Sequence, residues 1–422
     1  MATKTIDDID VRGKTVLMRV DFNVPIKEGK VANDKRIVAA MPSIQKLLGA
    51  GCKLVLMSHC GRPSGKGYEA EFSNRPASDR LSRLLGRSVR LGDPDVGGEA
   101  DLTAARALKA GEVLLLENVR FNAGEDLIDK AKKNPDKKPS PAQEAVINDF
   151  ILKLARLGEV YVNDAFGTCH RKHVSMFGVA KAIQAQGGPA VAGYLVEKEV
   201  RYLSEALANP KRPFVAILGG AKVSDKIKLI SSLLPRVDRI LIGGAMAYTF
   251  LKARGIRIGS SRVEEDQLEE MKRLLSTAGD KIILPADHVA TDVFDFKLMT
   301  GGKPTVTLDA TIPPGLMGLD IGPKTIEVYK SVIQGAGTVV WNGPMGVFEA
   351  DDYAAGTRAI AEALAAATDR GAVTVIGGGD SAAAVEELGL EKRMTHVSTG
   401  GGASLEYLEG RPMPPIEVLD KK

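Results

Sequence analysis

Short apolar runs alternate with longer helix-like segments along almost the whole of this 422-residue chain. Apolar runs of this length are typical of buried strands, and the segments between them carry apolar residues at helical spacing. Such an alternation is typical of βαβ units, which build parallel sheets covered by helices. Because a single core rarely grows beyond about 250–300 residues, the length favours two α/β domains.

The pattern predicts strands and helices in both halves of the chain. The predicted strands are residues 15–20, 53–58, 113–116, 160–163, 214–218, 239–242, 281–284, 339–341, 373–376 and 396–398. The predicted helices are residues 36–48, 141–157, 223–233, 265–276, 354–366 and 381–388. A further helical pattern at 193–209 precedes the strand at 214–218, and we interpret it as the connector between the domains.

Composition excludes several classes of protein. The net charge of +4 is small for this length and does not suggest a general nucleic-acid or membrane-surface binder. No apolar run reaches the roughly 18 residues that span a bilayer. Three cysteines do not form a disulfide framework, so we expect a reducing, cytoplasmic compartment.

In the first half, polar and cationic side chains follow each predicted strand. Ligands of open α/β sheets bind beyond the carboxyl ends of the strands, so these side chains are candidates for a site. Guanidinium groups bind carboxylates and phosphates in a bidentate fashion. Any one arginine alone would be an ordinary surface residue, but four such strand ends favour an anion pocket. The candidates are Asp21, Asn23, Arg36, His59, Arg62, Arg120 and Arg171.

In the second half, the strand ends are rich in glycine. The strand at 214–218 runs into Gly219 and Gly220, and we predict that it opens directly into a helix carrying Lys222 and Lys226. Glycine allows close approach of the backbone to a ligand, and a helix N-terminus offers N–H groups to phosphate. Four residues apart, the two lysines would share one helical face. This arrangement suits a polyphosphate, and a solvated lysine face is an equal alternative.

Asp380 follows the predicted strand at 373–376, after a run of three glycines. It could cap the next helix, which is the commoner role for such a residue. It could equally bind Mg²⁺, which prefers carboxylate, water and phosphate oxygens. The residues alone leave both roles open.

Other chemistries are weakly supported. The chain has neither a P-loop nor a G-x-G-x-x-G fingerprint with an acidic partner. Cys60 and Cys169 stand beside His59 and His170, but the spacing follows no strong rule for zinc or for a nucleophile. Small packing residues, beside histidines that contact an anion, are the commoner role for such cysteines. We also expect these thiols to lie beside the anion pocket. Neighbouring arginines would lower their pKa and make them reactive.

Seven motifs in order carry a resemblance to a known family. They are residues 19–25, 58–63, 117–121, 163–168, 218–226, 341–344 and 378–381. Together they resemble the phosphoglycerate kinase family over nearly the whole chain. The resemblance implies two doubly wound, Rossmann-like parallel-sheet domains joined by a hinge. It implies a 3-phosphoglycerate-binding domain at 1–192, an inter-domain helix at 193–209, a nucleotide-binding domain at 210–404, and a tail at 405–422 that packs back on the first domain.

The resemblance also implies an activity. The family transfers the 1-phosphoryl group of 1,3-bisphosphoglycerate reversibly to MgADP, giving 3-phosphoglycerate and ATP in glycolysis and gluconeogenesis. Direct in-line transfer with hinge closure needs no covalent intermediate, so positioning and charge neutralisation supply nearly all of the catalysis. The resemblance further implies a cytoplasmic monomer with small-molecule substrates and no nucleic-acid or membrane partner.

The resemblance assigns roles to individual residues. Those implied to hold 3-phosphoglycerate or 1,3-bisphosphoglycerate are Asp21, Asn23, Arg36, His59, Arg62, Arg120 and Arg171. Those implied to act in catalysis are Arg36, Lys222, Gly379 and Gly402. Those implied to hold the nucleotide are Gly219, Gly220, Lys222, Lys226, Gly243, Gly244, Gly318, Asn342, Pro344, Glu349, Gly378, Gly379, Asp380 and Ser381, with Mg²⁺ on Asp380 and the ribose on Glu349. Two other functions remain as alternatives: another kinase of small carboxylates, and a nucleotide-binding regulator that has kept the fold.

Overall fold

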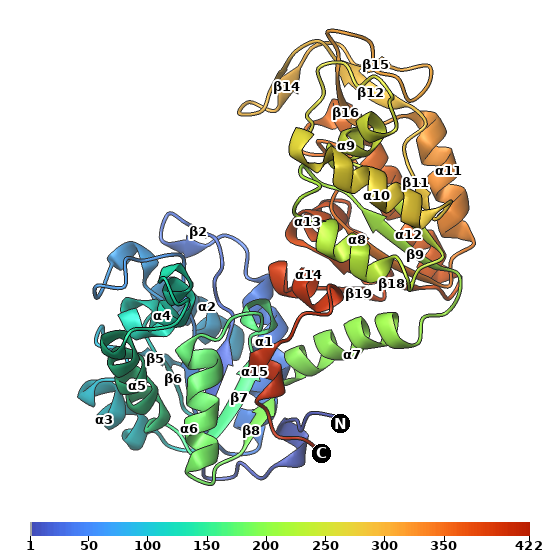
Figure 1. Cartoon of the computed structure of the whole chain (residues 1–422). Coiled ribbons are helices and arrows are strands. Elements are labelled where there is room, and N and C mark those ends of the chain that lie inside the picture. The colour runs from blue at the N-terminus through green and yellow to red at the C-terminus, as the bar shows by residue number, and fades with distance from the viewer. Residues whose placement is uncertain (1) are drawn as a thin grey trace. The chain divides into compact units, whose positions relative to one another are not determined.

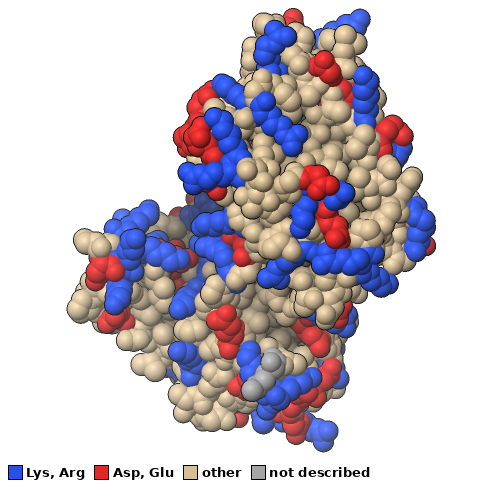
Figure 2. Space-filling view, turned by 45° about the vertical axis from the view of Figure 1, so that its right-hand side comes forward, with Lys and Arg blue, Asp and Glu red and all other residues tan. Residues whose placement is uncertain are grey.

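The computed structural model of the protein describes residues 2–422, which divide into two compact units (Figure 1). Unit 1 runs to Val200 and includes the tail Pro412–Lys422, and unit 2 is Arg201–Arg411. The division falls within helix α7 (Tyr194–Ala208). No helix among residues 2–422 is long and apolar enough to cross a membrane. Figure 2 shows basic and acidic side chains interspersed over the face that it presents, in keeping with the small net charge.

Unit 1 is built on a six-stranded parallel sheet with the order β5-β6-β4-β1-β7-β8. Its strands are β1 (Thr15–Val20), β4 (Lys53–Met57), β5 (Val89–Leu91), β6 (Val113–Leu115), β7 (Val160–Asp164) and β8 (Ala190–Ala192). The central strands β1, β4 and β7 are buried almost throughout, as expected when helices cover both faces of a parallel sheet. Strands β4, β5 and β6 lie on one side of β1, and the later strands β7 and β8 lie on its other side. The direction of winding therefore reverses between β1 and β7, which is where ligands of such sheets bind.

The helices of unit 1 cover this sheet. They are α1 (Lys35–Gly49), α2 (Arg75–Leu85), α3 (Glu99–Ala107), α4 (Leu127–Lys130), α5 (Pro141–Ala155), α6 (Val179–Ala185) and α15 (Pro414–Glu417). Helix α5 begins with a capping box between Ser140 and Gln143. The two ends of the described chain lie together at the edge strand β8 (Figure 1), where the Ala192 N–H donates to the Lys4 carbonyl and the Asp420 N–H donates to the Ala190 carbonyl. These bonds cover the open edge of the sheet.

Unit 2 contains a second six-stranded parallel sheet, with the order β11-β10-β9-β17-β18-β19. Its strands are β9 (Phe214–Leu218), β10 (Arg239–Ile242), β11 (Ile282–Ile283), β17 (Thr338–Asn342), β18 (Val373–Gly377) and β19 (His396–Val397). Its helices are α8 (Ile227–Leu233), α9 (Met246–Ala253), α10 (Leu268–Ala278), α11 (Pro323–Gln334), α12 (Ala355–Asp369), α13 (Gly379–Glu387) and α14 (Gly402–Leu408). The winding reverses between β9 and β17, so the prediction of two doubly wound parallel sheets is confirmed.

The sequence pattern missed the smaller β elements. A three-stranded antiparallel sheet joins β15 (Thr305–Val306), β12 (His288–Thr291) and β16 (Met317–Ile321). Two short hairpins also occur, β2 (Ile26–Lys27) with β3 (Lys30–Val31) and β13 (Phe294–Asp295) with β14 (Thr300–Gly301). Most of these strands are only two residues long and partly exposed, which leaves no apolar run for a sequence pattern to detect.

Candidate active site

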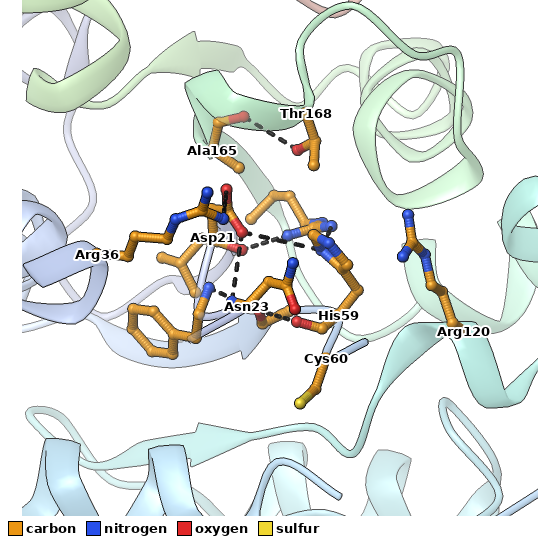
Figure 3. A network of polar contacts seen from close by, with 12 residues as sticks. Asp21, Asn23, Arg36, His59, Cys60, Arg120, Ala165 and Thr168 are labelled. Atoms are coloured by element: carbon orange, nitrogen blue, oxygen red, sulfur yellow. Dashed lines mark hydrogen bonds and ion pairs between the residues drawn. The ribbon is translucent and has the colours of Figure 1, made fainter. Parts of the chain in front are cut away.

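In unit 1, the first candidate residues follow β1 at the point where the winding reverses. The Asp21 carboxylate accepts a hydrogen bond of 2.8 Å from Arg36, which lies in the first turn of α1. Asp21 is nearly buried, whereas the Arg36 side chain is 36% exposed. Figure 3 shows Asp21, Asn23, Arg36 and His59 gathered together, with Arg120 to one side. Part of the Arg36 side chain therefore remains accessible from solvent.

The loops that follow three different strands are tied together around Gly61. Its N–H donates to the Asn23 side chain at 2.9 Å, and its carbonyl accepts from Arg120 at 2.6 Å. The Ser58 hydroxyl accepts from the Phe22 N–H at 2.9 Å. The ends of β1, β4 and β6 thus share one rigid cluster, which brings Asn23 and Arg120 to the same place.

His59 lies inside this cluster. Its Nδ1 is 3.0 Å from an Arg19 guanidinium nitrogen and 4.0 Å from the Asp21 carboxylate. Burial, and next the nearby cations Arg19 and Arg120, hold the pKa of His59 well below its ordinary value. His59 is therefore neutral and acts as a polar group rather than as a cation.

The last two candidates of unit 1 lie differently. Arg171 is 43% exposed and pairs with Asp129 at 2.9 Å, and His173 approaches the same carboxylate at 3.0 Å. Arg62 is exposed. Sequence reasoning missed Asp129, because no motif distinguishes one acidic residue beside a lysine-rich loop. It also gave no separate role to Arg19, which is wholly buried although it is an arginine.

In unit 2, a polar cavity of about 600 Å³ opens at the carboxyl ends of β9, β17 and β18. Ten of the predicted nucleotide or catalytic residues line it. They are Gly219, Gly220, Lys222, Lys226, Asn342, Gly378, Gly379, Asp380, Ser381 and Gly402.

The predicted helix carrying two lysines on one face is wrong. Helix α8 begins only at Ile227, and Lys226 is its N-cap residue. Ser224 donates both its N–H and its hydroxyl to the Glu264 carboxylate. This side chain thus takes the Ser224 backbone N–H away from a helical hydrogen bond. Lys222 lies in the preceding loop and is exposed, whereas Lys226 is half-buried and contacts the Asn342 side-chain oxygen. Burial lowers the pKa of Lys226, and Asp380 opposes that shift.

Two strand ends meet backbone to backbone beneath this cavity. The Gly219 N–H donates to the Asn342 carbonyl at 3.0 Å, and a side chain on Gly219 would overlap the Pro344 carbonyl oxygen. A side chain on Gly343 would overlap the Gly219 carbonyl in the same way. The side-chain nitrogen of Asn342 is buried without a partner in the part of the chain that the structure describes. Since Asn342 lines the cavity, this donor is left for a ligand.

An apolar cavity of about 500 Å³ adjoins the polar one, since Gly220, Ala221 and Asp380 line both. Four more predicted residues line it, namely Gly244, Gly318, Pro344 and Glu349. The sequence gave no sign of Phe296 and Met299, which reach this cavity from the β13–β14 hairpin. Gly243 lines neither cavity and packs against Met345.

Asp380 does not cap a helix. Helix α13 begins at Gly379, and its N-cap is Gly378, whose φ of 89° suits glycine. Asp380 is exposed in the first turn and borders both cavities. Residues 2–422 contain no cluster of three or more His, Cys, Asp or Glu side chains that could hold a metal ion. A single carboxylate beside a polar cavity fits Mg²⁺, which keeps several waters and shares its other ligands with substrate phosphates.

The expectation of reactive cysteines is wrong. All three cysteines are free and buried. Burial, and next Glu117, raise the pKa of Cys60. Burial also raises the pKa of Cys169, and this outweighs the opposing effect of Arg19. Both thiols are therefore protonated and shielded.

Comparison with known proteins assigns the family. The family described as phosphoglycerate kinase matches residues 6–411. The chain belongs to the phosphoglycerate kinase family. A phosphoglycerate kinase of Chloroherpeton thalassium is 52% identical over 422 residues, covering 99% of both chains. One from Prosthecochloris aestuarii is 51% identical over the full length of both chains.

Solved structures of the family agree with this fold. The phosphoglycerate kinase of Coxiella burnetii has a TM-score of 0.83 at 38% identity, covering 99% of this chain and 98% of that one. The enzyme of Pyrococcus horikoshii OT3 has a TM-score of 0.79 at 31% identity, with the same coverage. The resemblance drawn from the seven motifs is thus confirmed over the whole chain.

Proposed function

We propose that this chain transfers the 1-phosphoryl group of 1,3-bisphosphoglycerate to MgADP reversibly, giving 3-phosphoglycerate and ATP. The observation that carries the proposal is the pair of adjoining cavities in unit 2, polar beside apolar, at the winding reversal of its sheet. A nucleotide has the same division, with an apolar base and charged phosphates. Membership of the phosphoglycerate kinase family supports the same reaction.

In unit 1, we propose that 3-phosphoglycerate binds to the cluster formed after β1, β4 and β6. Arg36 and Arg120 supply cations for its carboxylate and phosphate groups, and Arg62 and Arg171 add to them. Asp21 orients Arg36 through their hydrogen bond. Asn23 and His59 supply polar contacts without adding charge.

In unit 2, we propose that Lys222 and Lys226 hold the nucleotide phosphates, with the Asn342 side-chain nitrogen, which has no partner among residues 2–422, as a further donor. Glu349 holds the ribose at the apolar cavity. Asp380 holds Mg²⁺, which neutralises phosphate charge when bound. The backbone N–H groups of Gly379 and Gly402, at the starts of α13 and α14, face the transferring group.

The reaction needs little from the protein beyond positioning. Both reacting oxygens are already anionic, so no general base and no covalent intermediate are required. Direct transfer requires reacting atoms about 3–3.5 Å apart, which also excludes water as an acceptor. We propose that the units close around the two substrates, with hinges at the connector 193–209, which contains α7, and at the return segment 400–404. Scattering that shows an unchanged radius of gyration in an active ternary complex would exclude this closure.

Calorimetric titration of two variants tests the assignment of substrates to units. Arg120→Gln should weaken 3-phosphoglycerate binding and leave ATP binding unchanged. Lys226→Gln should do the reverse. If either variant weakened both ligands equally, or only the other ligand, the assignment would be wrong.

We further propose a cytoplasmic monomer. The three free cysteines fit a reducing compartment. Light scattering of the purified chain should give the mass of a single chain, and a dimer mass at micromolar concentration would contradict this proposal.

A further inference from the structure

A buried series of hydrogen bonds lies next to the cluster formed after β1, β4 and β6 in unit 1. Arg19, at the end of β1, is wholly buried and donates through Nε to the Ser175 hydroxyl at 2.8 Å. Ser175 donates its hydroxyl and its N–H to the Glu125 carboxylate, at 2.6 and 2.9 Å. Glu125 is also wholly buried. Ser175 thus links a buried cation to a buried anion.

This series of hydrogen bonds fixes the orientation of Arg19. A buried guanidinium without an opposite charge and hydrogen-bond partners would be strongly destabilising. Glu125 supplies the charge, Ser175 holds Nε, and the Val20 carbonyl accepts from one terminal nitrogen. The other terminal nitrogen is thereby directed at His59, 3.0 Å from its Nδ1.

The contact with Arg19 determines where His59 carries its proton. A guanidinium can only donate hydrogen bonds. Nδ1 of the neutral ring must therefore accept, and the ring proton lies on Nε2. The Asp21 carboxylate, 4.0 Å from Nδ1, is too far away to accept a hydrogen bond from that nitrogen.

We propose that Glu125 and Ser175 are positioning residues that act through Arg19 to hold His59 as its Nε2–H tautomer. His59 then offers a hydrogen-bond donor to an anionic substrate. The opposite tautomer would present a lone pair at Nε2, which repels a carboxylate or phosphate oxygen. The last step rests on the proposed binding of 3-phosphoglycerate at this cluster.

The tautomer is measurable by ¹⁵N NMR of the histidine rings, without substrate. In the wild-type chain, Nδ1 of His59 should give the shift of an unprotonated nitrogen and Nε2 that of a protonated one. In Ser175→Ala, both shifts should move toward the averaged values of exchanging tautomers. Ser175→Thr keeps the hydroxyl and should restore the wild-type shifts. Ser78→Ala removes another buried serine of unit 1 and should change nothing.

Binding of 3-phosphoglycerate supplies the second readout. Ser175→Ala should weaken it about tenfold, as expected when a charge-assisted hydrogen bond is lost, and ATP binding should be unchanged. A proton on Nδ1 in the wild-type chain would overturn the proposal even if the variants fail to fold. Wild-type shifts and affinity in a folded Ser175→Ala would overturn it too. If His59→Ala left 3-phosphoglycerate affinity intact, the link to substrate would fail, whatever the tautomer.

Discussion

Replacing Arg36 with alanine should lower kcat about a thousandfold or more and lower stability only modestly. Arg36 is 36% exposed but Asp21 is only 7% exposed, so the loss of their ion pair leaves a buried acceptor without its donor, which costs about 1–3 kcal/mol. Arg36 also lies in the first turn of α1, where a cation is disfavoured by about 0.3–1 kcal/mol. These effects oppose each other, so we expect a net loss of up to about 2 kcal/mol, which lowers the melting temperature by up to about 4–8 °C.

The expected catalytic loss is much larger. A guanidinium that neutralises charge during phosphoryl transfer contributes about 10³-fold or more, which corresponds to about 4 kcal/mol of transition-state stabilisation. Steady-state kinetics with 3-phosphoglycerate and MgATP give kcat and KM, and thermal melting gives stability. A loss confined to KM would refute the reasoning, because Arg36 would then bind only the ground state.

Arg80 provides a matched control for this experiment. It pairs with Asp34 at 2.6 Å and its side chain is also 36% exposed, in the same unit. Its partner Asp34 is 29% exposed, so Arg80→Ala should shift melting by less than Arg36→Ala and leave kcat unchanged. An equal fall in kcat in both variants would show that Arg36 acts only through the fold.

Four further predictions follow from the site and the core. Asp380→Asn should weaken MgADP binding far more than metal-free ADP binding in calorimetry, and equal losses would exclude a metal role. Asp129→Asn should release Arg171 and lower the KM for 3-phosphoglycerate severalfold at unchanged kcat, whereas a raised KM would contradict competition for that guanidinium. A thiol reagent should modify Cys60 only as fast as the protein unfolds, and rapid modification of the native enzyme would contradict its burial and raised pKa. Burial raises the pKa of Asp164 to about 7 from 3.8, so the folded state binds this proton more tightly than the unfolded state. The free energy of unfolding should therefore fall by up to about 4 kcal/mol as pH rises from about 4 to about 7; urea unfolding checks this, and Asp164→Asn should flatten the dependence.

The large parallel elements were predictable because their pattern is strong. The strands at Phe214–Leu218 and Arg239–Ile242 have the predicted bounds, since each is an apolar run buried on both faces, apart from the partly buried Arg239. The short strands Val89–Leu91 and Ala190–Ala192 escaped prediction. They have only three residues each, and their pairing with neighbours far along the chain defines them.

The site was predictable as a set of residues but less so as a geometry. Strand ends brought Asn23 and Arg120 together because parallel strands place their carboxyl ends at one edge. The placement of Lys226 was wrong in detail, because Ser224, in the turn before α8, donates hydrogen bonds to Glu264, forty residues after it in the chain. The roles of Asp129 and the buried Glu125 were not predictable, since the role of an isolated acidic residue depends on partners that only the fold brings close to it.

The central claim is that this chain moves a phosphoryl group between the carboxylate of 3-phosphoglycerate and a magnesium-bound nucleotide. The most direct measurement is the initial rate of acyl-phosphate formation from MgATP, with 3-phosphoglycerate and with small carboxylates that lack its phosphate. We predict rapid transfer to 3-phosphoglycerate and rates lower by orders of magnitude with the others, because they leave the arginines of unit 1 unpaired. Preferred transfer to another carboxylate, or no transfer although both substrates bind, would contradict the account.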